Sequence, residues 1–330
     1  MTTEISLSEF KEKFSNTLLD LHWKHWTALG VASHVKPEET WIIDLEPLIV
    51  STLAIGLQDK RLLSSSIEWL IKNGEWINLS RLKRIVRVFL ERSPGLKEPP
   101  FCPEVLELFV STYNKNARNK IKFWKSDSDG PRKNLVNEYK TFFGAFKIRN
   151  ITTEPRLHHS SLIQLLLRSI LGVDAHTETL IYLLANESGN SNSIAKEIYY
   201  NQKNIYTILE RWSRAQIVTK ISKQKIPRYS LDRKKELLCA FGLKEIPKYI
   251  NWTRTFLLVD RLSKAVLTPP WSDDKYLLSS LFRDLVNEST SIGKSLGINM
   301  PEPAHYPGKQ YFSPFAIGVL GILRKLSKGR

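Results

Sequence analysis

The feature that most constrains this chain is the apolar spacing between residues 192 and 231. Residues 193–198 place apolar side chains at i, i+1 and i+4, and residues 202–215 place them at i, i+3, i+4 and i+7. Both spacings put the apolar residues on one face of a helix. They are Ile194, Ala195 and Ile198 in the first segment, and Ile205, Ile208, Leu209 and Trp212 in the second. The sequence therefore predicts two short helices that share a core.

The segments around these helices extend the pattern. Tyr199-Tyr200 predicts a tight turn, and Asn201 is expected to cap the second helix through its side-chain oxygen. Residues 217–221 and 228–231 favour two strands, joined by a basic turn. With a further helix expected at 177–184, the order is that of a winged helix-turn-helix.

Basic side chains are concentrated in the same stretch. Residues 191–235 contain 11 Lys or Arg and 3 Asp or Glu, and the whole chain of 330 residues has a net charge of +16. A surplus of this size is consistent with a polyanionic partner, and the alternative is a basic cytosolic protein whose charge serves only solubility. We expect the start of the second helix to contact the bases of double-stranded DNA, and other polar side chains to contact its phosphates. The predicted base contacts are Gln202, Lys203, Asn204 and Thr207, and the predicted backbone contacts are Lys196, Arg211, Lys223, Lys225 and Arg228.

Residues 176–231 resemble the winged-helix repressors related to the multiple-antibiotic-resistance and arsenical-resistance regulators. The core residues of both helices match, and Ile217-Val218 matches the lead into the hairpin. Those families often have glycine at the inter-helix turn and after the second helix, where this chain has Tyr199 and Gln216. Tyrosine is costly at positive φ, so we expect a longer or differently shaped turn. The resemblance implies a DNA-binding transcriptional regulator that acts as a homodimer on two half-sites.

A second resemblance covers the chain more broadly. The segment LHWKHWTALG at 21–30, followed by an internal helix-turn-helix, is similar to uncharacterised bacterial proteins encoded beside nucleotidyltransferase-type toxins. That resemblance implies an antitoxin-like or scaffold protein, which contacts a toxin or other protein and represses its own promoter. A winged helix used only for protein contacts, or as a spacer in a dimer, is the corresponding structural alternative.

Helical periodicity dominates the rest of the chain, so the expected fold class is mainly α with one small β-hairpin. The sequence divides into four expected regions. They are a helical N-terminal domain at 1–93, a linker and basic helical region at 94–155, the winged helix-turn-helix at 156–235 and a helical C-terminal region at 236–330.

A basic strip in the second region contains two aromatic residues, Phe123 and Trp124. Its cations are Lys115, Arg118, Lys120, Lys122 and Lys125. Aromatic side chains between cations are suited to stacking on unpaired bases. The alternative, which we favour, is an amphipathic surface element whose two aromatic residues lie in the core.

No motif in the sequence predicts catalysis, and we expect neither a cofactor nor a metal. Gly293-Lys294-Ser295 is similar to the end of a phosphate-binding loop, but the first glycine of that motif is replaced by Glu288. His22 and His25 lack cysteine or acidic ligands at zinc spacing, so we expect them to pack at the edge of a helical core. Asp44 and Glu46 are a possible pair of carboxylates without an identifiable partner.

Two isolated cysteines, Cys102 and Cys239, favour a reducing compartment. The N-terminus has no signal-peptide pattern, and no apolar run approaches the length needed to span a bilayer. We therefore expect a cytoplasmic protein without a membrane partner.

Overall fold

The computed structural model describes residues 4–91, 101–122, 133–221 and 226–328. Within these residues the fold is mainly α-helical, with one antiparallel pair of short strands, β1 (Thr219–Ile221) and β2 (Arg228–Ser230). The predicted fold class, mainly α with a small hairpin, is confirmed at this level. No helix in the described part of the chain is long and apolar enough to cross a membrane.

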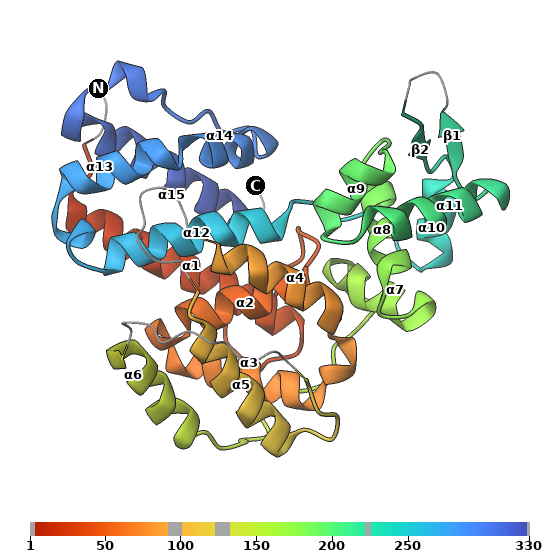
Figure 1. Cartoon of the computed structure of the whole chain (residues 1–330), viewed down its shortest axis with the longest axis horizontal. Helices are drawn as coiled ribbons and strands as arrows, with labels where there is room; N and C mark the ends of the chain where they lie inside the picture. Colours follow the sequence, from red (N-terminus) through yellow and green to blue (C-terminus); the bar gives the residue numbers. More distant parts are fainter. Residues whose placement is uncertain (1–3, 92–100, 123–132, 222–225, 329–330) are drawn as a thin grey trace.

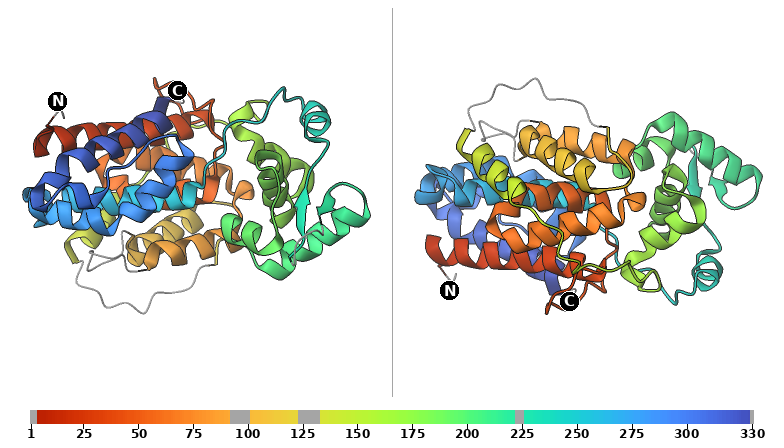
Figure 2. Two further views of the ribbon diagram at one scale, coloured as in Figure 1. Left: turned by 90° about the horizontal axis from the view of Figure 1, so that it is seen from above. Right: turned by 90° about the horizontal axis from the view of Figure 1, so that it is seen from below.

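Among the residues that the structure describes, ten α-helices form a body at one end of the molecule (Figures 1 and 2). They are α1 (Leu7–Ala28), α2 (Leu45–Ile55), α3 (Lys60–Lys72), α4 (Leu79–Leu90), α5 (Pro103–Asn116), α6 (Lys133–Gly144), α12 (Trp252–Leu267), α13 (Lys275–Asp284), α14 (Val286–Ser295) and α15 (Phe312–Lys328). The others and the hairpin lie at the opposite end: α7 (Ile163–Leu171), α8 (Ala175–Ala185), α9 (Ser191–Ile198), α10 (Gln202–Arg214) and α11 (Lys234–Ala240).

The first and last parts of the chain share the core of the body. Helix α1 packs along α15, and α12 packs against α2. One hydrophobic cluster extends from Ile5 to Leu326 and includes residues of both parts. Helices from the regions expected at 1–93 and 236–330 are therefore packed together, although α11 lies at the other end of the molecule. The chain passes between the two ends after α6 and before α12 (Figure 1).

The histidines of α1 lie inside this core, and the expectation that they pack at its edge was wrong. His22 is 0% exposed and His25 is 1% exposed, because α12 covers them, with the Trp252 ring 4.6 Å from that of His25. Burial lowers the pKa of His22 to about 4, and burial with the neighbouring His22 lowers the pKa of His25 to about 3. Both rings are therefore neutral near pH 7.

Candidate nucleic-acid interface

Helices α8, α9 and α10 pack around the apolar residues that the sequence singled out. Ile194, Ile198, Ile205 and Leu209 are each at most 3% exposed and belong to one cluster. Trp212 is partly buried against the same cluster. The predicted shared core of the two helices is confirmed. It is separate from the main cluster of the body, and α7 contributes residues to both.

The hairpin is fixed to the helices at two places. The backbone of Tyr229 exchanges two hydrogen bonds with Gly189, which lies between α8 and α9, with N···O distances of 2.8 and 3.0 Å. The Tyr229 hydroxyl donates to Glu210 of α10 at 2.5 Å, and Lys220 of β1 pairs with the same carboxylate at 2.6 Å. Lys220 also lies opposite Tyr229 in the strand register. The hairpin is therefore held beside the C-terminal half of α10.

The turn between α9 and α10 has a left-handed residue despite the absence of glycine. Tyr199 has φ 61° and ψ 49°, and Gln216, after α10, has φ 57°. Tyr199 thus adopts the positive φ that the sequence analysis treated as costly for tyrosine. At Tyr199 the cost of positive φ is offset by contacts with the body, because Arg84 donates to its carbonyl at 3.2 Å. Asn201 caps α10 as predicted, accepting from the Lys203 amide at 2.8 Å.

Three residues of α4 and its N-cap hold this turn, and we call Asn78, Arg81 and Arg84 the clamp. The Asn78 side chain donates to the Tyr200 hydroxyl at 2.6 Å, and Arg81 Nε donates to the Ile198 carbonyl at 3.0 Å. Arg84 adds its bond to Tyr199, and its guanidinium lies 5.6 Å from the centre of the Tyr200 ring. The clamp binds three consecutive residues of the turn, so the body fixes the start of α10.

Behind the clamp lies a buried network of charged side chains. Glu46 is 0% exposed and accepts from Arg81 at 2.6 Å and from Arg168 at 2.8 Å. Arg81 also pairs with Asp44, and Arg168 pairs with Glu178 at 2.6 Å. Burial alone would raise the pKa of Glu46, but the two guanidinium groups hold it below its ordinary value. The network joins α2, α4, α7 and α8.

The structure brings the predicted base-contact residues together. Gln202, Lys203, Asn204 and Thr207 are all exposed on the first two turns of α10, opposite its buried stripe. The Thr207 hydroxyl donates to the Lys203 carbonyl at 2.9 Å, which leaves its oxygen able to accept. The Gln202 amide reaches Ser191 of α9 at 3.4 Å.

The predicted backbone-contact residues are placed less uniformly. Lys196 on α9 and Arg211 on α10 are exposed. Arg228 is half-buried, and its guanidinium donates to the hydroxyl and carbonyl of Ser188 at 3.0 and 2.9 Å. Arg228 therefore has a structural contact that the sequence did not predict. Lys223 and Lys225 lie outside the described residues, as do Phe123, Trp124 and Lys125 of the basic strip.

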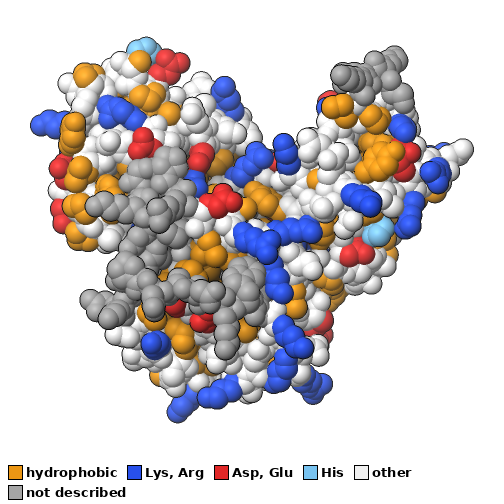
Figure 3. Space-filling view, in the orientation of Figure 1, with side chains coloured by type: hydrophobic (Ala, Val, Ile, Leu, Met, Phe, Trp, Pro, Cys, Tyr) orange, Lys and Arg blue, Asp and Glu red, His pale blue; other side chains and the backbone are white. Residues whose placement is uncertain are grey.

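The basic side chains are not confined to α9 and α10. In Figure 3, Lys and Arg side chains gather where α4 meets the far end of the molecule and continue toward the lower edge of the view. Helix α4 itself carries Lys83, Arg84 and Arg87. The face of the molecule that presents α4 therefore has a positive surface suited to a polyanion.

Sequence reasoning missed the clamp and the network. The available signal was a charged residue inside an apolar helical pattern, as at Arg168 within residues 161–171. Asp44 and Glu46 were identified as paired carboxylates, but their partner Arg81 could not be recognised because it lies on a different helix.

Among the residues that the structure describes, no group of three or more His, Cys, Asp and Glu side chains is placed to hold a metal ion. Comparison with protein-family models, with curated proteins and with solved structures found no significant match to the chain.

Proposed function

We propose that residues 175–231 form a winged helix-turn-helix that binds double-stranded DNA, in a cytoplasmic transcriptional regulator. In this proposal α10 enters the major groove and the hairpin lies beside the phosphate backbone. The observation that carries the proposal is the set of polar side chains on the first two turns of α10, which the core leaves exposed. The clamp supports it, because a reader of bases needs a fixed orientation.

The chemistry of these side chains suits base recognition. Asn and Gln can bind adenine through two hydrogen bonds, Lys can bind guanine, and Thr can contact several bases. Lys196 and Arg211 lie on the same two helices and are available for phosphates. The second core keeps its apolar residues on the opposite face of α10, so the exposed residues can be replaced without opening a cavity.

The test compares Asn204→Ala with the wild type on a selected DNA site and on scrambled DNA of the same length. Asn204 is exposed, so its substitution should change the free energy of unfolding by at most about 0.5 kcal/mol. The loss on the selected site should be roughly 1–3 kcal/mol, with little loss on scrambled DNA. The matched control is Asn137→Ala, which removes an exposed helical asparagine from α6, at the other end of the molecule.

Equal losses on both DNAs, or no loss on either, would contradict recognition of bases by α10. The function would then be better explained by protein contact.

One observation favours this second candidate, an antitoxin-like or scaffold protein that binds a toxin or other protein. Large apolar side chains are exposed on the same end of the molecule, with Ile170 54%, Ile217 46% and Ile226 58% exposed. Exposed apolar side chains at this end of the molecule are available to a protein partner. They are also available for the homodimer that we propose for DNA binding.

Light scattering tests the proposed homodimer. At micromolar protein it should give the mass of a dimer, and a monomer under these conditions would contradict that part of the proposal.

A further inference from the structure

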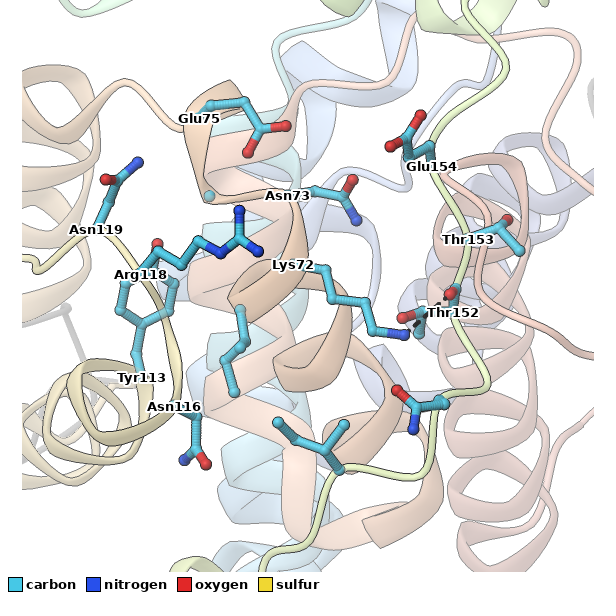
Figure 4. A pocket seen from close by; sticks show the side chains of 14 residues that line it. Lys72, Asn73, Glu75, Tyr113, Asn116, Arg118, Asn119, Thr152, Thr153 and Glu154 are labelled. Atoms are coloured by element: carbon cyan, nitrogen blue, oxygen red, sulfur yellow. Dashed lines mark hydrogen bonds between the residues drawn. The ribbon is translucent and has the colours of Figure 1, made fainter.

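A cavity in the body lies apart from α7–α11 and the hairpin. It has a volume of about 740 Å³ and is bordered by the end of α3, the end of α5 and residues 148–154 (Figure 4). Eleven of its lining side chains are polar or charged, and all of these except Asn150 are labelled in Figure 4. A cavity of this volume is within the range that holds small ligands.

One wall of the cavity is fixed by a buried carboxylate. Glu68, 2% exposed, accepts from the backbone amides of Arg149 at 2.6 Å, Ile151 at 2.8 Å and Thr152 at 3.3 Å. Lys72 lies across this wall, 3.3 Å from the Glu68 carboxylate and 3.2 Å from the Thr152 carbonyl. The segment that forms the wall is therefore held in place before any ligand binds.

The opposite wall is equally close-packed. The Tyr113 hydroxyl lies so near Gly74 that a Cβ atom on residue 74 would be 1.9 Å from the Tyr113 oxygen. Only glycine fits there without moving the tyrosine. Tyr113 is the one aromatic residue of the lining, and it is 2% exposed, so it offers no ring face on which a sugar could stack.

The lining carries charges of both signs. Arg118 supplies one cation, and Glu75 and Glu154 supply two carboxylates, whereas Lys72 is already paired with the buried Glu68 at 3.3 Å. In Figure 4 the Arg118 guanidinium points into the cavity beside Asn73, and the carboxylates of Glu75 and Glu154 face inward from opposite walls. A ligand with both charges can pair with Arg118 and with a carboxylate at the same time, whereas a ligand of one charge can pair with groups of only one sign.

We propose that this cavity binds a small zwitterion of the amino-acid class. Arg118 receives the carboxylate of the ligand, for which the planar guanidinium is well suited. Glu154 and Glu75 receive its ammonium group, and the amides that line the cavity are available to its side chain. Arg118, one of the cations of the basic strip, thus has a proposed partner other than nucleic acid. This site is independent of the DNA-binding proposal.

The experiment titrates the full-length protein with each standard free amino acid, to about 10 mM, by isothermal calorimetry. At least one should bind saturably to the wild type. Its analogues without the amino group, or without the carboxylate, should bind at least about tenfold more weakly. Arg118→Gln and Glu154→Gln should each weaken binding by at least about tenfold. Both side chains are exposed, so neither substitution should unfold the protein.

The matched control is Lys122→Gln, which removes an exposed cation from the same segment without touching the cavity. It should bind the amino acid as the wild type does. The proposal is overturned if no amino acid binds saturably, if Arg118→Gln and Glu154→Gln bind as tightly as the control, or if acetate binds as tightly as the best amino acid.

Discussion

Asp260 is a carboxyl group in the interior of the body, 2% exposed. One of its oxygens accepts from the Ser51 hydroxyl at 2.8 Å, and the other is buried without a hydrogen-bond partner among the described residues. Burial raises the pKa of Asp260 well above its ordinary value. Between pH 3.8 and this raised pKa, the folded state binds more protons than the unfolded state, so stability falls as pH rises.

We therefore expect Asp260→Asn, which does not titrate, to become increasingly stable relative to the wild type as pH rises. The difference in the free energy of unfolding should grow as pH rises above 3.8, for as long as the folded wild type keeps Asp260 protonated. His22 and His25 act in the opposite direction, since their lowered pKa values cost stability below pH 6.5. Both proteins retain these histidines. The comparison is made above pH 5, where both rings are neutral in the folded state, because His22 Nε2 lies 2.9 Å from the Ser51 hydroxyl that donates to Asp260. Urea unfolding at several pH values above 5 measures the difference between the two proteins, and a difference that stays constant with pH would exclude this account of Asp260.

Gln216 and Tyr199 both have positive φ, but only Tyr199 is compensated by the body. Gln216 is exposed, and its left-handed conformation favours glycine. Gln216→Gly should stabilise the protein by up to about 1 kcal/mol, whereas Tyr199→Gly should not, because Tyr199 packs against the main core. Chemical denaturation of both variants gives the comparison. A less stable Gln216→Gly would show that strain is not the dominant cost there.

Some residue-level features follow from local sequence, and others do not. The cap at Asn201 and the exposure of Gln202 and Asn204 depend on neighbours within one or two helical turns, so the sequence predicts them. The conformation of Tyr199 depends on Arg84, 115 positions away. No local pattern contains that contact.

At the scale of elements, the helices and the hairpin could be predicted because their apolar periodicity is local. The contacts that join helices distant in the sequence could not be predicted in this way. Arg168 on α7 bonds to Glu46 on α2, 122 positions earlier, and each looks like an isolated charge in an apolar helix. Such a pair is recognised only when the two helices are seen to pack together.

The network should be sensitive to the loss of one partner. Arg168→Met leaves Glu46 and Glu178 buried with fewer compensating charges, so it should destabilise the protein by about 3–5 kcal/mol. The double variant Glu46→Gln, Arg168→Met should lose less than the sum of the single losses. Arg156→Met, at an exposed position, is the control and should stay within about 0.5 kcal/mol. Additive losses in this cycle would mean that the two side chains are not coupled.

At the scale of the whole molecule, the sequence suggests separate helical regions, whereas the structure packs α1 against α15 and α12 against α2. Which helices pair over such separations is not encoded in periodicity, because many apolar faces are mutually compatible. The net charge of +16 follows directly from the sequence, but the positions of these charges on the surface could not be predicted from it.

The contribution of particular surface charges can be separated from that of net charge through the salt dependence of DNA binding. If Lys196 and Arg211 contact phosphates, the double variant Lys196→Ala, Arg211→Ala should reduce the slope of log K against log salt by about 2. The control double variant, Lys140→Ala and Lys147→Ala, removes the same charge from exposed positions in and after α6. It should leave the slope nearly unchanged. The same slope change in both variants would show that net charge, and not these contacts, governs the binding.

The clamp has a consequence for the spacing of the two DNA half-sites that a homodimer would bind. Because α4 holds the turn before α10 through Ile198, Tyr199 and Tyr200, the direction of α10 follows the body. In a homodimer the distance between the two α10 helices would then be fixed. Their separation would have to match whole turns of the double helix, about 34 Å each. Inserting half a helical turn between half-sites would rotate one site to the far side of the duplex, beyond the reach of the second helix.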